Sequence, residues 1–390
     1  MKLPDTFCAL PWINLSTDVN GSLRPCCKFA QPEPTNEYQL PNMKQGTLDV
    51  LWNDVRFQNL RQAFLDGKKP KECQSCWDEE AAGVKSFRVQ FAIDKKIPLD
   101  MEFTPIAASG PRAFDLKLNN VCNLKCRICG PQASSTFLKE YQERFNVKVE
   151  DGSYWLSNKI LGTANESVIN LWAKDLVHLE ITGGEPMASP ENMKILELLI
   201  NSGRAKEITI LLNTNATLYN KKFLDLIVQF KEVTLCLSVD DLGERLEYER
   251  YPTEWAEIQD NIKKFLELRS NHKNLFLTLC PTVSNFNIYY LSDYLEWSKP
   301  LNIFTYFNIL HYPPSHSVKN LPDKLKEIVS ARLTAPEFKV VKNFLHLERE
   351  NDNLIKEFIS KNNELDEFRQ QRFEPTFGEW GKLIMEYSNE

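Results

Sequence analysis

The stretch Cys122-Asn123-Leu124-Lys125-Cys126-Arg127-Ile128-Cys129 decides how the rest of the chain is interpreted. It spaces three cysteines as C-x3-C-x2-C, shortly after an alternating, strand-like run at 114–118. Cysteine clusters in an intracellular enzyme more often bind metals or iron–sulfur clusters than form disulfides. A cubane cluster ordinarily takes four thiolates, so a set of three leaves one iron with an open position. Half of a zinc knuckle, or simply buried thiols, is the structural alternative.

This spacing resembles the cluster motif of the radical S-adenosylmethionine (SAM) superfamily. The resemblance implies that Cys122, Cys126 and Cys129 ligate a catalytic 4Fe–4S cluster whose fourth iron chelates SAM. One-electron reduction then cleaves SAM to methionine and a 5′-deoxyadenosyl radical, so a reductant such as flavodoxin or ferredoxin is an expected partner. Many members have an aromatic residue before the third cysteine, where this chain has Ile128.

Size and charge narrow the class of protein. The 390 residues are 42% apolar and 26% charged with a net charge of −6, as in a globular protein of two or three domains. Nothing in this balance indicates a nucleic-acid surface, and no apolar run approaches the length of a membrane span. The N-terminus lacks the apolar segment of a signal peptide. Ten cysteines without an export signal indicate a reducing compartment, so we expect a cytoplasmic protein without membrane or nucleic-acid partners.

A second cysteine pattern lies in the N-terminal region, residues 1–105. Cys8, Gly21 and Cys26 form C-x12-G-x4-C, and Cys73 and Cys76 form C-x2-C. This pattern resembles the twitch domain, the short form of the SPASM domain, and so implies an auxiliary 4Fe–4S cluster held by the four cysteines. Four thiolates close the coordination sphere, which suits electron transfer or structure. A four-cysteine zinc site is the alternative.

Local patterns in this region predict how the cysteines come together. Residues 13–16 and 22–24 read as a β-hairpin that turns at Asn20-Gly21 and brings two thiols to one end. Apolar spacing predicts an amphipathic helix over about 49–65. Cys27 is surplus to the pattern and is either a neighbour without a role or a functional thiol.

Residues 112–312 alternate strand-like and helix-like runs, which indicates parallel strands. Six such units resemble the partial (β/α)6 barrel of the radical SAM core, so the expected fold class is α/β, with a small α+β twitch-like domain before the barrel and a helical extension after it. The expected strands are 114–119, 177–182, 207–213, 233–240, 276–283 and 304–311. Functional residues are expected near their carboxyl ends.

The expected strand ends carry polar motifs that resemble SAM-binding segments of the family. Gly183-Gly184-Glu185-Pro186 follows the second strand, and the resemblance implies that these glycines and Glu185 contact the SAM amino group. Asn215 lies in a turn similar to the family's TNGT segment, although an ordinary Asx turn is equally compatible. The remaining SAM contacts implied by the resemblance are Ser238, Asp240 and Val283.

The remaining residues, 313–390, carry no recognisable metal motif or phosphate loop. Apolar spacing predicts helices over 321–333, 339–358 and 363–373, and we expect them to cap the barrel. Lys125 and Arg127, beside the cluster cysteines, either stabilise cluster charge or are solvated. Cys236 and Cys280 are expected to be small core residues, with a hydrogen-atom donor as the functional alternative.

The sequence thus predicts a radical SAM oxidoreductase that abstracts hydrogen from a small polar metabolite, with the auxiliary cluster aiding electron transfer or substrate placement. A peptide-modifying epimerase or cross-linking maturase is the alternative within the same class. A non-catalytic iron–sulfur or zinc scaffold is the alternative of another class. The sequence specifies neither the substrate nor the outcome of the reaction.

Overall fold

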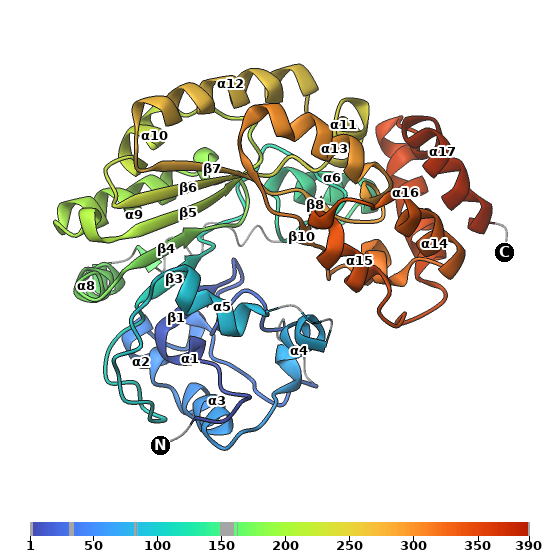
Figure 1. Ribbon diagram of the computed structural model, residues 1–390. Helices are drawn as coiled ribbons and strands as arrows, with labels where there is room; N and C mark the ends of the chain where they lie inside the picture. Colours follow the sequence, from blue (N-terminus) through green and yellow to red (C-terminus); the bar gives the residue numbers. More distant parts are fainter. Residues whose placement is uncertain are drawn as a thin grey trace.

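The computed structural model describes residues 3–30, 35–81, 83, 85–148, 160–161 and 163–388. Figure 1 shows a central sheet with helices above it, an N-terminal region below it and a C-terminal helical region at one end. The sheet has eight strands in the order β2-β1-β3-β4-β5-β6-β7-β9. Its strands are β1 (Asn14–Thr17), β2 (Leu23–Arg24), β3 (Ala113–Leu116), β4 (His178–Ile181), β5 (Thr209–Thr214), β6 (Glu232–Leu237), β7 (Leu275–Leu279) and β9 (Phe304–Thr305).

The α/β fold class predicted from the sequence is confirmed. Every neighbouring pair from β1 to β9 is parallel, and only β1 and β2 pair antiparallel. Each of the six expected strands is present, in chain order, but most end earlier than expected. The residues that follow the ladders instead form the loops at the carboxyl ends, where β/α enzymes place functional groups.

The N-terminal region is joined to the core sheet by a strand pair. Residues 14, 15 and 16 of β1 pair in parallel with residues 113, 114 and 115 of β3. The predicted hairpin is confirmed, with Thr17 opposite Leu23 and Gly21 in the left-handed region at φ 85°. The pairing of β1 with β3 was not predicted, because it joins residues about a hundred positions apart.

The helices of the N-terminal region are α1 (Leu10–Ile13), α2 (Leu48–Trp52), α3 (Val55–Leu65), α4 (Gln74–Ala81) and α5 (Phe87–Asp94). The prediction of one helix over 49–65 is wrong. The chain breaks at Asn53-Asp54, and the Asp54 side chain accepts a hydrogen bond from the backbone N–H of Arg56 at 2.9 Å, which caps α3. A buried Arg61 fixes the break by donating to the Trp52 carbonyl at 2.9 Å.

One face of the sheet is covered by helices and the other is polar. Leu212, Leu235 and Leu279 share a core cluster with residues of α9, α10 and α12. The alternate positions carry polar groups, such as Asp115 of β3 and Glu180 of β4, which are register partners. We call this second side the open face. The surrounding helices are α6 (Ser135–Phe145), α8 (Thr163–Trp172), α9 (Pro190–Asn201), α10 (Lys221–Ile227), α11 (Glu244–Glu249), α12 (Trp255–Asn271) and α13 (Leu291–Ser298).

The C-terminal region has its own hydrophobic cluster, to which Phe286 and Val283 of the core also belong. Its helices are α14 (Asp323–Arg332), α15 (Lys339–Leu345), α16 (Leu354–Arg369) and α17 (Phe373–Met385). The prediction of one helix over 339–358 is wrong, because the polar run 346–353 separates α15 from α16. Asn351 there accepts a bond from the backbone N–H of Asn353 at 2.8 Å, a local turn that competes with helix.

Two further strands, β8 (Thr282–Val283) and β10 (Asn308–Ile309), form a small parallel pair beside this region. The predicted helix over 363–373 is also misplaced, since α16 ends at Arg369 and Gln370 is left-handed at φ 55°. In the part of the chain that the structure describes, no helix combines the length and apolarity needed to cross a bilayer.

Candidate active site

The three-cysteine loop follows β3 and is held by the start of α6. Ser134, which caps α6, and Thr136 both donate to the Leu124 carbonyl, at 2.6 and 2.8 Å. The Leu124 N–H in turn points at the Cys122 sulfur, at 3.4 Å. Cys126 is buried, Cys122 is half-buried and Cys129 is exposed. The loop therefore presents its thiols from a backbone that polar contacts already fix.

Burial and mutual contact control the protonation of these thiols. Burial raises the pKa of Cys122 to about 12. A hydrogen bond from Cys129 lowers the pKa of Cys126, and the same contact raises the pKa of Cys129. Thiolates are the form that binds a metal, so any metal bound at this loop would displace protons.

Gly184 fits against the cluster loop more closely than any other residue could. Both Gly183 and Gly184 have left-handed backbones, at φ 80° and 55°. A Cβ at position 184 would lie 2.3 Å from the carbonyl oxygen of Val121, the residue before Cys122. The next N–H, that of Glu185, donates to the same carbonyl at 2.8 Å. The Gly-Gly turn and the cysteine loop thus form one backbone unit.

The Glu185 carboxylate is completely buried and connects two strand ends. It accepts hydrogen bonds from the Met187 N–H at 3.1 Å, the Thr214 hydroxyl at 2.9 Å and the Asn215 N–H at 2.7 Å. Burial raises the pKa of this carboxyl in spite of these donors. These bonds join the Gly-Gly turn after β4 to the turn after β5.

Asn215 connects that turn to the cysteine loop. Its amide donates to the Asn123 side-chain oxygen at 2.9 Å, and the Asn123 amide donates to the Thr217 hydroxyl at 2.8 Å. Asn123 is the residue after Cys122. Ala216, between Asn215 and Thr217, has a left-handed backbone at φ 61°. Glycine adopts this conformation more easily, and glycine is the residue at this position in the family's TNGT segment.

Ser238 and Asp240 lie beyond the carboxyl end of β6, as expected. Ser238 is half-buried and its N–H donates to the Thr214 carbonyl at 2.9 Å. Asp240 is fully buried and accepts bonds from the Thr282 N–H at 2.8 Å and from Nε of Arg250 at 2.6 Å. Val283 is also fully buried, in the C-terminal hydrophobic cluster.

Arg250 is a site residue that the sequence did not single out for this position. Its positive charge opposes the burial-driven rise in the pKa of Cys122 and adds to the lowering of the pKa of Cys126 that the Cys129 hydrogen bond causes. Backbone contacts place it beside the three-cysteine loop: the N–H groups of Lys125 and Arg127 donate to the carbonyls of Tyr251 and Glu249, at 2.5 and 2.8 Å. The three-cysteine loop is thus hydrogen-bonded on one side to the start of α6 and on the other to the end of α11 and the residues that follow it.

The four N-terminal cysteines line one cavity. Cys8 lies just before α1 and Cys26 just after β2, while Cys73 ends the short 3-10 helix that precedes α4 and Cys76 lies in the first turn of α4. Leu10, Pro11, Pro25, Phe29 and Phe64 supply apolar walls. Burial raises the pKa of Cys8 to about 12 and raises the pKa of Cys26 as well. The residues brought together are those that the spacing predicted.

A zinc ion and a cubane cluster require different spacings of the four thiolates. Zn–S bonds of about 2.3 Å bring four tetrahedral thiolates to roughly 3.8 Å from one another. Within the described residues, no three His, Cys, Asp or Glu side chains lie close enough to share one ion. A cubane holds each thiolate on a different iron, so its ligands are spread more widely.

Two other cysteine positions are now defined. Cys27 is exposed and does not line the four-cysteine cavity. Burial of its sulfur raises the pKa of Cys27 to about 12, with a further contribution from the nearby carboxylates of Asp115 and Glu180. The Cys236 and Cys280 side chains contact each other across β6 and the end of β7.

The open face beside Cys27 is charged. Lys117 Nζ lies 3.6 Å from an Asp115 oxygen, and Lys95 Nζ lies 3.4 Å from a Glu180 oxygen. These pairs come from β3, β4 and α5.

Comparison with known families follows this geometry. A sequence model of the radical SAM superfamily matches residues 116–286, which contain β4 to β7 and the three-cysteine loop. A model of the iron–sulfur cluster-binding domain SPASM matches residues 8–77, which contain the four-cysteine cavity. The two matches therefore place the core in the radical SAM class and the N-terminal region in an iron–sulfur cluster-binding domain family.

The chain belongs to the radical SAM superfamily and carries a SPASM-type domain on the N-terminal side of its core. These two domains imply SAM and two iron–sulfur clusters as cofactors. The predicted recognition and cofactors are confirmed at this level. No curated protein matches the chain.

Solved structures match this chain only at low similarity. Native anSMEcpe with bound AdoMet is 17% identical at a TM-score of 0.37, with 67% of this chain and 62% of that chain covered. Streptococcus suis SuiB bound to S-adenosylmethionine is 15% identical at a TM-score of 0.35, with 81% and 58% covered. SuiB bound to precursor peptide SuiA is 15% identical at 0.34, with 74% and 56% covered. The chain therefore spans less than two thirds of these proteins.

Proposed function

We propose that the protein is a radical SAM enzyme that cleaves SAM reductively and abstracts a hydrogen atom from its substrate. The observation that carries this proposal is the three-thiol loop, locked against the Gly183-Gly184 turn by the contact of Gly184 with Val121. Bound at such a loop, the cluster and SAM supply a 5′-deoxyadenosyl radical upon one-electron reduction. A one-electron donor such as flavodoxin or ferredoxin is therefore a required partner.

We propose the following roles for the residues. Cys122, Cys126 and Cys129 hold the catalytic cluster, and the exposed backbone of Gly183 and Gly184 contacts the SAM amino group. The roles of Asn215 and Glu185 are to fix that turn, and Asp240 orients Arg250 beside SAM. Ser238, half-buried at the end of β6, faces SAM. Cys8, Cys26, Cys73 and Cys76 hold the auxiliary cluster.

For Val283 the proposal is narrower. The side chain is fully buried, so it supports the adenine side of the site from within the core and does not offer a free surface.

As substrate we propose a segment of a peptide or protein, in preference to the small metabolite expected from the sequence. The support is the edge of the sheet at β9, whose outer side pairs with no strand among the described residues. Exposed aromatic side chains lie on β9, directly after it and on the neighbouring strand β7: Phe304 (71%), Tyr306 (54%) and Phe276 (49%). An extended peptide binds such an edge through its backbone and fills neighbouring apolar surface with its side chains. Epimerisation and cross-linking are the reactions to test first.

A small polar metabolite is the second candidate. The charged pairs on the open face, Lys117 with Asp115 and Lys95 with Glu180, are the observation that favours it. Such groups exchange partners with a zwitterionic or polyhydroxy ligand more readily than with an apolar side chain.

Both substrate classes are tested by one assay of reconstituted protein with SAM and dithionite. The rate of 5′-deoxyadenosine release is measured with synthetic unstructured peptides and, separately, with mixed amino acids and sugars. We expect peptides to stimulate release, and Phe304→Asp to weaken that stimulation without lowering the basal rate. Stimulation by the metabolites alone favours the second candidate. No 5′-deoxyadenosine in any arm rejects the enzyme.

A further inference from the structure

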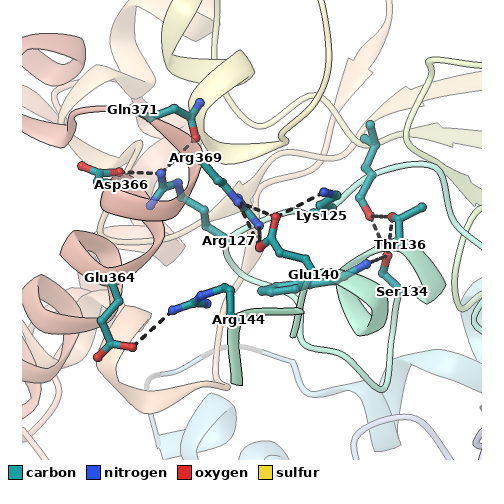
Figure 2. A network of polar contacts seen from close by, with 12 residues as sticks. Lys125, Arg127, Ser134, Thr136, Glu140, Arg144, Glu364, Asp366, Arg369 and Gln371 are labelled. Carbon is teal, nitrogen blue, oxygen red and sulfur yellow. Dashed lines mark hydrogen bonds and ion pairs between the residues drawn. The ribbon is translucent and has the colours of Figure 1, made fainter. Parts of the chain in front are cut away.

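Arg127 stands between the second and third cysteines of the cluster loop, and its side chain enters the C-terminal helical region (Figure 2). The side chain is completely buried. Its Nε donates to the Tyr248 carbonyl at 3.1 Å, and Nη1 donates to the carbonyl and side-chain oxygens of Asn362 at 3.3 and 3.1 Å. Nη2 donates to Asp366 at 2.5 Å and to Gln371 at 3.0 Å. Every nitrogen of the guanidinium is therefore used.

Asp366, on α16, is shared among three elements. Besides Arg127 it accepts the Tyr248 hydroxyl at 2.8 Å and the backbone N–H of Phe373, the first residue of α17, at 2.7 Å. The Tyr248 ring also lies against the guanidinium, whose carbon is 3.6 Å from the ring centroid. One carboxylate thus fixes the cluster loop, α11 and the junction of α16 with α17.

A second buried contact joins α16 to the same loop. Arg369 and Glu140 form an ion pair at 2.8 Å, with side chains 1% and 0% exposed. Glu140 lies on α6 and also receives Lys125 at 3.3 Å. Figure 2 shows the Arg127–Asp366 and Arg369–Glu140 contacts side by side. It also shows the Arg144–Glu364 ion pair, at 3.3 Å. Residues 125 and 127 of the loop are therefore both held by α16, one directly and one through α6.

This arrangement is costly if its only purpose is stability. A buried arginine loses its hydration, and an apolar residue of similar size often stabilises a core equally well. Five directed bonds instead fix the position of a residue that directly follows Cys126 and precedes Cys129 by two positions. Neither family match reaches beyond residue 286, so no role is assigned to α16 by those matches.

We propose that α16 and the junction 370–373 are part of the catalytic-cluster site, with Arg127 as a positioning residue held by Asp366. The network sets the spacing of Cys126 and Cys129 and so determines how the cluster they hold receives SAM. This inference rests on the proposed assignment of the three cysteines to the catalytic cluster. The C-terminal helices accordingly position residues of the catalytic-cluster site, in addition to packing against the core.

The test compares the reconstituted full-length protein with Arg127→Met, Arg127→Lys and Asp366→Asn variants. Three quantities are measured: irons per chain, the SAM-induced change in the electron paramagnetic resonance spectrum of the reduced protein, and the rate of 5′-deoxyadenosine release. The SAM-induced change reports on the catalytic cluster alone, because the auxiliary cluster has no open iron. The matched control is Lys361→Met, which removes an exposed ion pair with Glu357 from the same helix.

We expect Asp366→Asn and Arg127→Met to alter the SAM-induced spectrum and to slow release by about 10- to 100-fold. Arg127→Lys is expected to recover part of the loss, and Lys361→Met to match the wild type. Gln371→Ala removes a single bond, so it supplies a folded variant with a smaller spectral change if Arg127→Met fails to fold. Wild-type spectra and rates in Asp366→Asn and Gln371→Ala overturn the inference. A wild-type protein without any SAM-induced change overturns the proposed function itself.

Discussion

The Cα of Gly184 lies so close to Val121 that an added Cβ would stand 2.3 Å from its carbonyl oxygen and 2.9 Å from its carbonyl carbon. This contact joins the turn after β4 to the residue preceding the first cluster cysteine. Both partners are backbone, so neither can move aside without shifting a loop. The fit of one glycine thus couples two motifs that lie sixty residues apart in the sequence.

Gly184→Ala is therefore expected to displace the start of the cysteine loop. The clash and the left-handed backbone together are expected to lower the free energy of unfolding by about 2 kcal/mol or more. Iron bound at the three-cysteine site should fall with it, which iron analysis after reconstitution measures. Gly203→Ala is the matched control, since Gly203 also has a positive φ but nothing lies within 4 Å of its Cβ position. Equal effects of the two substitutions would contradict the steric account.

Glu140→Gln leaves the buried Arg369 without its carboxylate partner. Breaking one side of a buried pair typically costs about 3–5 kcal/mol, because the remaining charge is desolvated and uncompensated. Urea unfolding of the apoprotein measures the loss. Lys361→Met, which breaks the exposed pair with Glu357, is expected to change the free energy of unfolding by less than about 1 kcal/mol. A loss for Glu140→Gln no larger than that of the control would rule out a stabilising role for the buried pair.

His316 makes the C-terminal region sensitive to acid. Burial, with the nearby charges of Lys361 and Arg127, lowers the pKa of this histidine to about 3. Since the unfolded chain protonates near pH 6.5, the folded state is favoured above that pH and loses stability as pH falls below it. At pH 5 the loss is about 2 kcal/mol.

His316→Phe removes the titrating group and keeps an aromatic ring against Phe286 and Phe358. The difference between urea-unfolding free energies at pH 7 and pH 5 is expected to be smaller in this variant by about 2 kcal/mol. All other titrating groups are common to both proteins, so they cancel. An unchanged difference would show that His316 is not the group responsible.

Cys26 and Cys27 are adjacent in sequence but are expected to differ in function. Cys26 lines the four-cysteine cavity, whereas Cys27 is exposed toward the open face. Cys26→Ser is expected to lose about four irons per chain, the content of one cubane. Cys27→Ser is expected to retain the full iron content. Iron analysis that shows the reverse would move the ligand assignment to Cys27.

Features of the fold set by local pattern were predictable. The hairpin turning at Gly21 and the six core strands follow from turn residues and alternating apolar positions. The two cysteine sets follow from fixed spacing. The hairpin, the strands and the three-cysteine loop are each encoded within about twenty residues, where backbone geometry relates sequence to structure directly, whereas the four-cysteine set also joins two short motifs across a long gap.

Features that depend on distant partners were not predictable. The pairing of β1 with β3 depends on which strand edge is free, and sequence periodicity does not contain that information. In the sequence, Arg127 and Arg369 could not be distinguished from arginines exposed to solvent. Only the fold brings their partners, Asp366 and Glu140, next to them. The prediction of a single helix over 339–358 was wrong for a local reason, because the turn at Asn351 interrupts the helix in spite of the apolar spacing.

The central claim is that three thiols leave one iron open to SAM. The most direct test is anaerobic reconstitution of the wild type and of the Cys122→Ser, Cys126→Ser and Cys129→Ser triple variant, followed by iron analysis and addition of SAM and dithionite. The wild type should hold about eight irons per chain and release 5′-deoxyadenosine, and the variant should hold about four and release none. Release of 5′-deoxyadenosine by the triple variant, or zinc in place of iron in the wild type, would contradict the claim.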